Sequence, residues 1–199
     1  KTEKEVKIET TLSISAIYIQ RILDIQVTWN IQADGTVDIA MDVKRNPIFP
    51  MLPRFGLRLF LPKEMKDVTY YGLGPVESYM DKRRASWHGE FSSPVTDLHE
   101  DYIRPQENGS HYDCDYVTLS SNAGHLLPER KTSLTAVSGQ TFSFNASVYT
   151  EEELTNKAHH YELEECGSTV LCLDYRQNGI GSNSCGPQLI EKYRLDENE

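Results

Sequence analysis

The sequence around which the fold is arranged runs from Tyr70 to Arg83 and reads YYGLGPVESYMDKR. It follows an apolar run, Phe55 to Leu61, and its first residues have the character of a strand. Gly72 and Gly74 then let the backbone turn where a Cβ atom would clash, and Pro75 prevents further ladder pairing. We predict a strand ending in a rigid turn, which in sandwich proteins carries functional or interface residues. The alternative is a tight turn with a solvated salt-bridge cluster.

Outward from this turn, most of the chain has the patterns of β-strands. Alternating or β-prone segments occur at 6–14, 18–32, 36–44, 54–61, 116–119, 133–137, 141–149, 168–175 and 188–195. In the segment at 54–61, the alternation places Arg54 on the outward face. Asp34-Gly35 predicts a tight hairpin turn between two of these segments.

The segments between the strands are of two kinds. Thr150 and the three glutamates after it form a capping box, which predicts one short helix ending near Ala158. Residues 75–113 are polar, rich in aromatic residues and without periodicity, so they predict a long loop. Many antiparallel strands and a single short helix together predict an all-β sandwich, in one domain covering residues 1–199.

Composition limits the function classes. The chain has 199 residues, 38% hydrophobic and 25% charged, which is ordinary for a soluble globular protein. Its net charge of −10 argues against nucleic acid and anionic membranes as partners. Four cysteines without a C-x-x-C pair predict free thiols in a reducing, cytoplasmic compartment, with a Cys166–Cys172 disulfide as the alternative. The chain begins at Lys1 and a strand pattern follows almost at once, so we expect a piece of a longer polypeptide.

Four segments carry a family pattern in compatible order: LPRFGL at 52–57, GLGPVESYMDK at 72–82, YIRPQENG at 102–109 and GIGSNSCGP at 179–187. Together they resemble the C-terminal, small-chain domain of the large β-galactosidases of glycoside hydrolase family 2. The resemblance implies a supersandwich of two large antiparallel sheets, similar to the galactose mutarotase-like fold. It also implies a parent enzyme that hydrolyses terminal β-D-galactosides such as lactose with retention of configuration.

In that family the catalytic glutamates lie in a TIM-barrel domain, which this chain lacks. The resemblance therefore implies no catalytic residue here and an isolated chain without activity. It implies that the domain packs on the catalytic barrel, lines the edge of the β-galactoside site and contributes to a homo-oligomer. Family members commonly use Mg²⁺ and Na⁺ in other domains, so we expect no cofactor or metal in this one.

The resemblance also suggests where the substrate edge lies. In some family members the loop equivalent to Asn183, Ser184 and Cys185 brings a tryptophan to the edge of the galactose site. Cys185 occupies the matching place here, and a thiol offers no stacking platform. Either the aglycone side of the site is more open in this protein, or another residue provides the stacking platform. The alternative interpretation is a glycine-rich turn between two strands.

The region from 70 to 113 combines aromatic rings with polar groups, as sugar-binding surfaces do. The candidates for a sugar-facing or interface loop are Glu77, Tyr79, Asp81, Tyr102, Glu107 and Asn108. Glu77 with Asp81, or Glu107 with Asp113, could be a glycosidase carboxylate pair, but acids that bind arginines or water are the simpler interpretation. His99-Glu100 begins like H-E-x-x-H, yet Ile103 stands where the second histidine should be, so no metal site is predicted.

Three other function classes remain open, and the simplest of them is a pure scaffold that binds no ligand. A free-standing carbohydrate-binding module would explain the aromatic residues of the 70–113 region. An aldose mutarotase or epimerase would share the supersandwich, but that chemistry needs a histidine and a glutamate aimed at the sugar ring, and no motif supplies such a pair.

Overall fold

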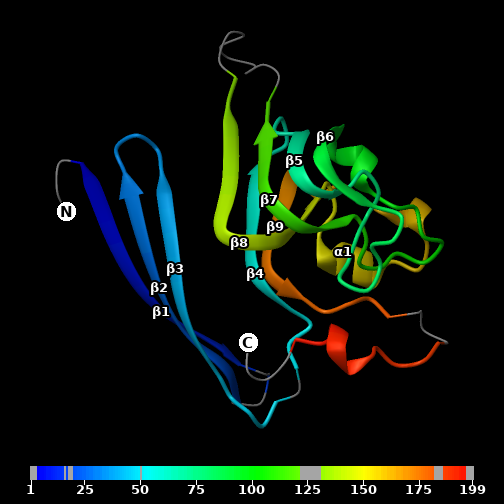
Figure 1. Cartoon of the computed structure of the whole chain (residues 1–199), viewed down its shortest axis with the longest axis horizontal. Helices are drawn as coiled ribbons and strands as arrows, with labels where there is room; N and C mark the ends of the chain where they lie inside the picture. The colour runs from blue at the N-terminus through cyan, green and yellow to red at the C-terminus, as the bar shows by residue number, and fades with distance from the viewer. Residues whose placement is uncertain are drawn as a thin grey trace. The chain divides into compact units, whose positions relative to one another are not determined.

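The structure is a computed structural model that describes residues 4–15, 17, 20–49, 51–121, 131–181 and 186–195 (Figure 1). The chain folds into two compact units, Lys1–Met51 and Leu52–Glu199, and each is described by itself. The single domain over residues 1–199 stays a prediction.

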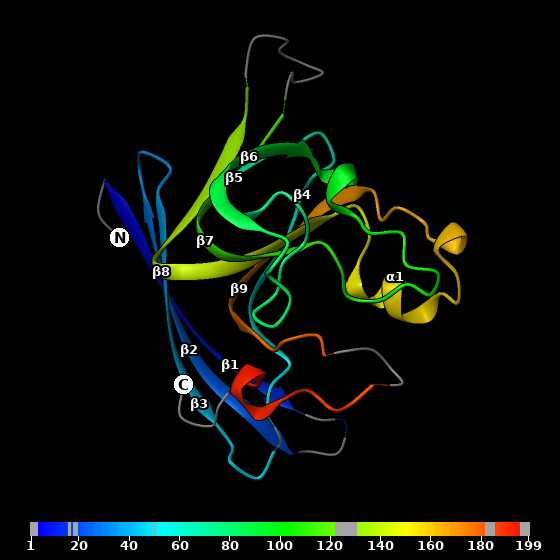
Figure 2. The same ribbon diagram turned by 45° about the vertical axis from the view of Figure 1, so that its right-hand side comes forward.

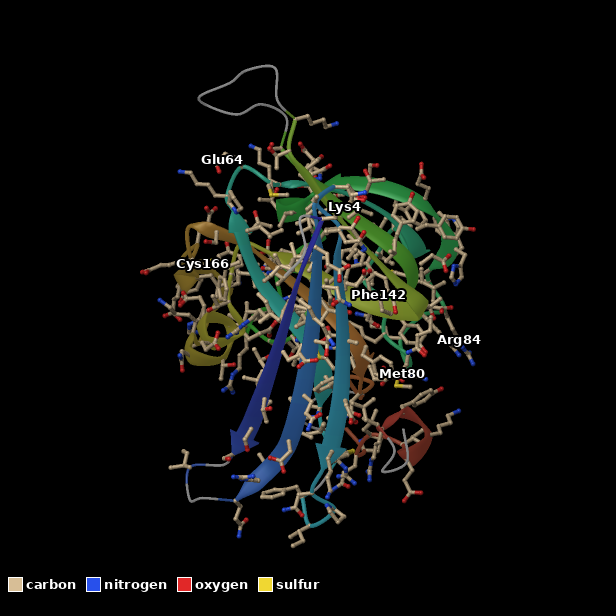
Figure 3. The ribbon with its side chains drawn as sticks, turned by 90° about the vertical axis from the view of Figure 1, so that its left-hand side faces the viewer. Lys4, Glu64, Met80, Arg84, Phe142 and Cys166 are labelled. Atoms are coloured by element: carbon tan, nitrogen blue, oxygen red, sulfur yellow. The ribbon has the colours of Figure 1, made fainter. Side chains whose placement is uncertain are left out.

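The first unit is a three-stranded antiparallel sheet with the strand order β1-β2-β3. Its strands are β1 (Glu5–Ser15), β2 (Arg21–Gln32) and β3 (Val37–Arg45), which Figure 3 shows lying next to one another. The predicted hairpin at Asp34-Gly35 joins β2 to β3, and Gly35 has a φ of 94°, which glycine adopts without strain. In the register, Ile25 lies opposite Leu12 and Val43, so the apolar residues of all three strands share one face.

The second unit contains a six-stranded antiparallel sheet with the order β4-β9-β8-β7-β5-β6, whose middle strands appear strongly curved in Figure 2. The strands are β4 (Arg54–Pro62), β5 (Asp67–Gly74), β6 (Trp87–Pro94), β7 (Ser110–Ser120), β8 (Ser133–Ser147) and β9 (Ser168–Gln177). β8 pairs with β7 along both of its halves and with β9 along its second half, and its pairing with β7 is interrupted by register shifts. Figure 1 shows the sharp bend of β8, as bulges produce.

The core of the second unit lies on one face of this sheet. Its fully buried members include Val68 and Tyr70 on β5, Val117 on β7, Phe144 on β8 and Leu171 on β9. The ring of Tyr70 meets the ring of Phe144 edge to face, with centroids 5.0 Å apart. β5 is therefore the strand at the centre of the hydrophobic core.

The all-β class, with two antiparallel sheets and one short α-helix, is confirmed. The helix α1 spans Glu151–Asn156, and the Thr150 hydroxyl accepts a hydrogen bond of 3.1 Å from the Glu153 amide, as the capping box predicted. The helix ends two residues before the predicted Ala158. The relation of the two sheets that defines a supersandwich stays a prediction.

Four local predictions were wrong. The strand does not break at Gly72, because β5 continues to Gly74 and its last three residues pair with β6. Residues 75–113 are not one long loop, because they contain β6 and the 3-10 helix η1 (Val95–Leu98), and β7 begins at Ser110. The separate strands at 133–137 and 141–149 form the one strand β8. The strand expected at 188–195 is absent: the described residues there include the 3-10 helix η3 (Glu191–Tyr193) and no strand.

The alternative of a Cys166–Cys172 disulfide was also wrong. Cys114, Cys166 and Cys172 are free thiols, and Cys185 lies outside the described residues. Another 3-10 helix, η2 (His160–Glu162), follows α1. None of the helices within the described ranges has the length and apolar character needed to cross a membrane.

Candidate functional site

The last residues of β5 pack closely against both neighbouring strands. A Cβ atom on Gly72 would lie 2.9 Å from the Cα atom of Cys114 on β7, and one on Gly74 would lie 2.8 Å from the ring of Phe91 on β6. Any side chain at either position would collide with a neighbouring strand. The glycines of the Gly-Leu-Gly-Pro sequence are therefore required by packing, and they set the point from which the next residues leave the sheet.

Glu77 is the first charged residue after β5, and it holds three separate parts of the chain together. Its Oε1 accepts hydrogen bonds from Lys82 Nζ and from the Tyr102 hydroxyl, and its Oε2 accepts one of 2.8 Å from the Gly109 amide. Only 4% of its side chain is exposed. Burial raises the pKa of Glu77, but the bonds from Lys82, Tyr102 and Gly109 outweigh burial, and the pKa lies below its usual value. We call Glu77, Lys82, Tyr102 and Gly109 the Glu77 clamp.

Glu107 belongs to a second cluster, centred on Arg54 of β4. Arg54 Nη1 lies 2.8 Å from Glu107 Oε2 and 3.3 Å from Glu151 Oε1, and its Nε and Nη2 bind the carboxylate of Asp174 on β9. Arg54 was predicted to point outward, but its side chain is only 23% exposed. We call Arg54, Glu107, Glu151 and Asp174 the Arg54 cluster.

The Arg54 cluster contains three carboxylates and one guanidinium. Burial is the main reason that the pKa of Glu107 is raised to about 7, repulsion from Glu151 adds to it, and Arg54 lowers it. Burial likewise raises the pKa of Asp174, against the opposing effect of Arg54. Burial and the excess of negative charge in the cluster therefore act together to raise the pKa of Glu107.

Asp81 binds the glycine-rich segment near the end of the chain. Its Oδ1 accepts a hydrogen bond of 3.0 Å from the Ile180 amide, and its Oδ2 accepts one of 2.8 Å from the Gly181 amide. The two residues are about 100 positions away from it in sequence, so the contact joins two of the four segments of the family pattern. Asn183, Ser184 and Cys185, the predicted substrate-edge residues, lie outside the described residues.

The remaining candidates are Tyr79, Asn108 and Tyr102. The hydroxyl of Tyr79, which is only 2% exposed, lies 3.4 Å from Glu107 Oε1. Asn108 is 4% exposed, and its side chain accepts a hydrogen bond from the Glu100 amide and donates one to the Gln106 carbonyl. These two side chains thus serve internal contacts. Tyr102 is half-buried and lines a pocket of about 140 Å³, together with Lys82, Arg83 and Glu100.

Sequence reasoning missed Arg54, Glu151 and Asp174 as partners of Glu107. A signal for Asp174 was present, because an aspartate in the apolar run of β9 is buried and needs a cation to compensate it. The two carboxylate pairs considered for a glycosidase do not share partners. Glu77 binds Lys82, whereas Asp81 binds the amides of residues 180 and 181. Asp113 binds His88 at 2.9 Å and not the Arg54 cluster, to which Glu107 belongs.

Comparison with known proteins shows which family the whole chain resembles. A family model described as "Beta galactosidase small chain" matches residues 1–199. The chain is 42% identical over 198 residues to a protein of Actinobacillus pleuropneumoniae named "Beta-galactosidase", and the match covers 100% of this chain and 18% of that protein. A protein of the same name from Staphylococcus xylosus is 42% identical over 98% of the chain, and one from Lactococcus lactis subsp. lactis is 36% identical over 84%. The chain spans less than a fifth of the length of each, with shares of 18%, 19% and 16%.

Proposed function

Because the chain belongs to the β-galactosidase small chain family, we propose that it is the non-catalytic C-terminal domain of a glycoside hydrolase family 2 β-galactosidase. The observation that carries this proposal is the extent of the matches. The family model covers residues 1–199, whereas the matching region makes up only 18% of the length of the Actinobacillus relative. The complete enzyme hydrolyses terminal β-D-galactosides such as lactose, and it retains the configuration through a covalent galactosyl intermediate.

The way in which the loop acids are used supports a non-catalytic role. A glycosidase needs two carboxylates that face each other across the scissile bond and remain available to the substrate. Here Glu77 binds Lys82, Tyr102 and Gly109, and Glu107 binds Arg54. Acids engaged in this way organise the loops of their own domain. The proton donor and the nucleophile then belong to the catalytic barrel outside this chain, as do the Mg²⁺ and Na⁺ that members of this family commonly use.

The proposed contribution of this domain is to pack on the barrel and to line one edge of the substrate site with Asn183, Ser184 and Cys185. The anchoring of the residues just before them supports this role, because the Ile180 and Gly181 amides are held by Asp81. With Cys185 in place of an aromatic platform, the aglycone has no ring from this position to stack on. We place the complete enzyme in the cytoplasm, as a homo-oligomer.

Turnover of lactose and of o-nitrophenyl β-D-galactoside tests the proposal. The complete enzyme should hydrolyse both substrates, and the isolated chain should give no turnover above the buffer rate. Co-expression of this chain with the rest of the polypeptide should restore the activity that the rest lacks when expressed alone. Hydrolysis by the isolated chain at rates typical of enzymes would contradict the non-catalytic role.

One observation favours a second candidate, a carbohydrate-binding module. The pocket beside Tyr102 combines an aromatic ring with the charged groups of Lys82, Arg83 and Glu100, which resembles the composition of sugar sites. Calorimetry with galactose and lactose separates the two functions. Binding by the isolated chain at millimolar concentration or below, lost in the Tyr102→Ala variant, would favour the module.

A further inference from the structure

The pocket beside Tyr102 lies between two segments that carry opposite charges. Residues of the segment 82–86 form one border of the pocket, and Glu100 and Tyr102 form the other. The pocket volume of about 140 Å³ is well below the roughly 300–1,000 Å³ of most small-molecule sites. The pocket is therefore better suited to a single side chain of a partner protein than to a free small molecule.

The first border is cationic. Lys82 is balanced by Glu77, with which it forms an ion pair, so Arg83 and Arg84 supply the net charge. Arg83 lies over the ring of Tyr112, with 5.7 Å between its Cζ atom and the ring centroid. Arg84 is exposed and forms no hydrogen bond or ion pair with any residue that the structure describes, and Figure 3 shows its side chain pointing away from the ribbon.

Two aspartates near this border are engaged by other groups. The carboxylate of Asp81 accepts hydrogen bonds from the amides of residues 180 and 181. Asp113, which lies near Arg83, binds His88 at 2.9 Å. The positive charge of Arg84 therefore remains available at the surface.

The second border is anionic. Through its carboxylate, Glu100 forms no hydrogen bond or ion pair within the described part of the chain. The side chain of Asp101 is 78% exposed and lies 3.7 Å from the ring of His99. Burial lowers the pKa of His99, so its ring is neutral at pH 7 and does not balance Asp101. Against these two acids, the segment 99–104 carries one cation, Arg104.

Apolar groups lie between and beside the two borders. Val76 and Ala85 line the pocket, Val76 is 45% exposed, and Ile103, next to Tyr102 in sequence, is 79% exposed. An apolar and aromatic centre with a charged rim is the usual anatomy of a protein–protein interface. We call Val76, Arg83, Arg84, Glu100, Asp101 and Tyr102 the charged pocket face.

The arrangement of the charges identifies the kind of partner. An acidic partner would be repelled by Glu100 and Asp101, and a basic partner by Arg83 and Arg84. A second copy of the same face avoids both, because a two-fold rotation about an axis through the pocket lays the cationic border of each copy on the anionic border of the other. The chain has a net charge of −10, so two copies that met without such complementarity would repel each other.

We propose that the charged pocket face is a two-fold interface between two copies of this chain, in which the cationic border of each copy faces the anionic border of the other. This inference rests on the homo-oligomer included in the proposed function, and it names the surface through which that oligomer forms. Tyr102 and Val76 lie near the axis, where the pocket takes up a side chain of the other copy.

Charge reversal in the complete enzyme, followed by sedimentation velocity, tests the interface. The two double variants are Arg83→Glu with Arg84→Glu and Glu100→Arg with Asp101→Arg. Each should raise the protein concentration at which the assembly falls to half its mass by about tenfold or more. Combining all four substitutions exchanges the two borders, and it should return this concentration to within about threefold of the parent value.

Lys63→Glu with Lys66→Glu is the matched control, because it changes the net charge by the same amount on exposed residues of the same unit. Glu64, which lies between these lysines in sequence, is labelled in Figure 3 well apart from Arg84. The control should assemble like the parent. Raising the salt concentration from about 0.1 M to about 1 M should weaken the parent assembly, because the Debye length falls from about 10 Å to about 3 Å.

A monomeric parent enzyme, or double variants that assemble like the parent, would overturn the inference, and so would a fourfold variant that stays dissociated. If the double variants keep the mass of the parent and lose lactose turnover, the face contacts the rest of the polypeptide and the two-fold interface is wrong. Each of these failures leaves the assignment as part of a β-galactosidase untouched, because lactose turnover by the complete parent enzyme tests that assignment separately.

Discussion

The guanidinium of Arg54 binds the buried carboxylate of Asp174 through two hydrogen bonds, 3.0 Å from Nε to Oδ1 and 2.5 Å from Nη2 to Oδ2. The Asp174 side chain is 3% exposed, and 120 residues separate the two partners in sequence. The pair joins β4 to β9, the strands that begin and end the six-stranded sheet in chain order. Bidentate pairs of this kind are among the strongest charge-assisted contacts in proteins.

Arg54→Leu should destabilise the protein strongly. It leaves Asp174 and Glu107 without their cation, and removal of one partner from a buried ion pair costs about 3–5 kcal/mol. Urea unfolding of parent and variant measures this loss. Arg58→Leu, on the same strand, is the control, because Arg58 binds Glu152 in an exposed pair that contributes about 0–1 kcal/mol. An equal decrease in the free energy of unfolding in the two variants would contradict the central role of Arg54.

Glu107→Gln should change the pH dependence of stability. The folded-state pKa of Glu107 is raised to about 7, so the stability it contributes is present below its unfolded-state pKa and is lost as pH rises through 7. Relative to the parent, Glu107→Gln should therefore gain stability as the pH rises from 4.5 to about 7, by at most about 1.4 kcal/mol per pH unit, and the difference should level off above that range. Urea unfolding at several pH values measures the difference, and a constant offset across this range would show that Glu107 does not titrate there.

Glu77→Gln should have the opposite pH signature. The pKa of Glu77 is lowered in the folded state, so its contribution is present above the unfolded-state value and is lost as pH falls through the folded-state value. At pH 7 the variant should lose about 1.5–3 kcal/mol, because Lys82, Tyr102 and the Gly109 amide lose a charged acceptor. The difference in the free energy of unfolding between parent and variant should become smaller as the pH falls below 4. Glu64→Gln, at an exposed position labelled in Figure 3, should differ from the parent by less than about 0.5 kcal/mol.

Gly72→Ala should destabilise the protein by about 1–3 kcal/mol, because the new methyl group would overlap the backbone of Cys114 and force β5 and β7 apart. Gly139→Ala on β8 is the control, since no atom lies within 4 Å of a Cβ built there. The control should be neutral or stabilise by about 0.4–1 kcal/mol through the unfolded chain. Thermal unfolding of both variants tests the argument, which fails if Gly72→Ala unfolds at the temperature of the parent.

The features predicted correctly are those that depend on neighbouring residues. The hairpin at Asp34-Gly35 follows from the conformational freedom of two adjacent residues, and the start of α1 follows from the reach of Thr150 to the amide three positions on. β6 was missed because it is the last strand in the sheet order, and its largely exposed residues do not show an apolar alternation.

The features that were missed depend on distant residues. The pattern at 188–195 suggested a strand, but the strand nearest in sequence, β9, already pairs with β4 and β8 on its two sides and offers no free edge. Alternation placed Arg54 outward, and only the folded sheet shows that Asp174 lies beside it. The same applies to Asp81, whose partners are about 100 residues away and are backbone amides, which no pattern of side chains reveals.

The Asp81 carboxylate accepts hydrogen bonds from the main-chain amides of Ile180 and Gly181, so this anchor does not depend on the side chain at position 180. The Ile180 side chain can therefore be varied in a mutant library while the anchor remains constant. This separates a position that can be varied from Asp81 and Gly179, which fit each other so closely that they must be kept together.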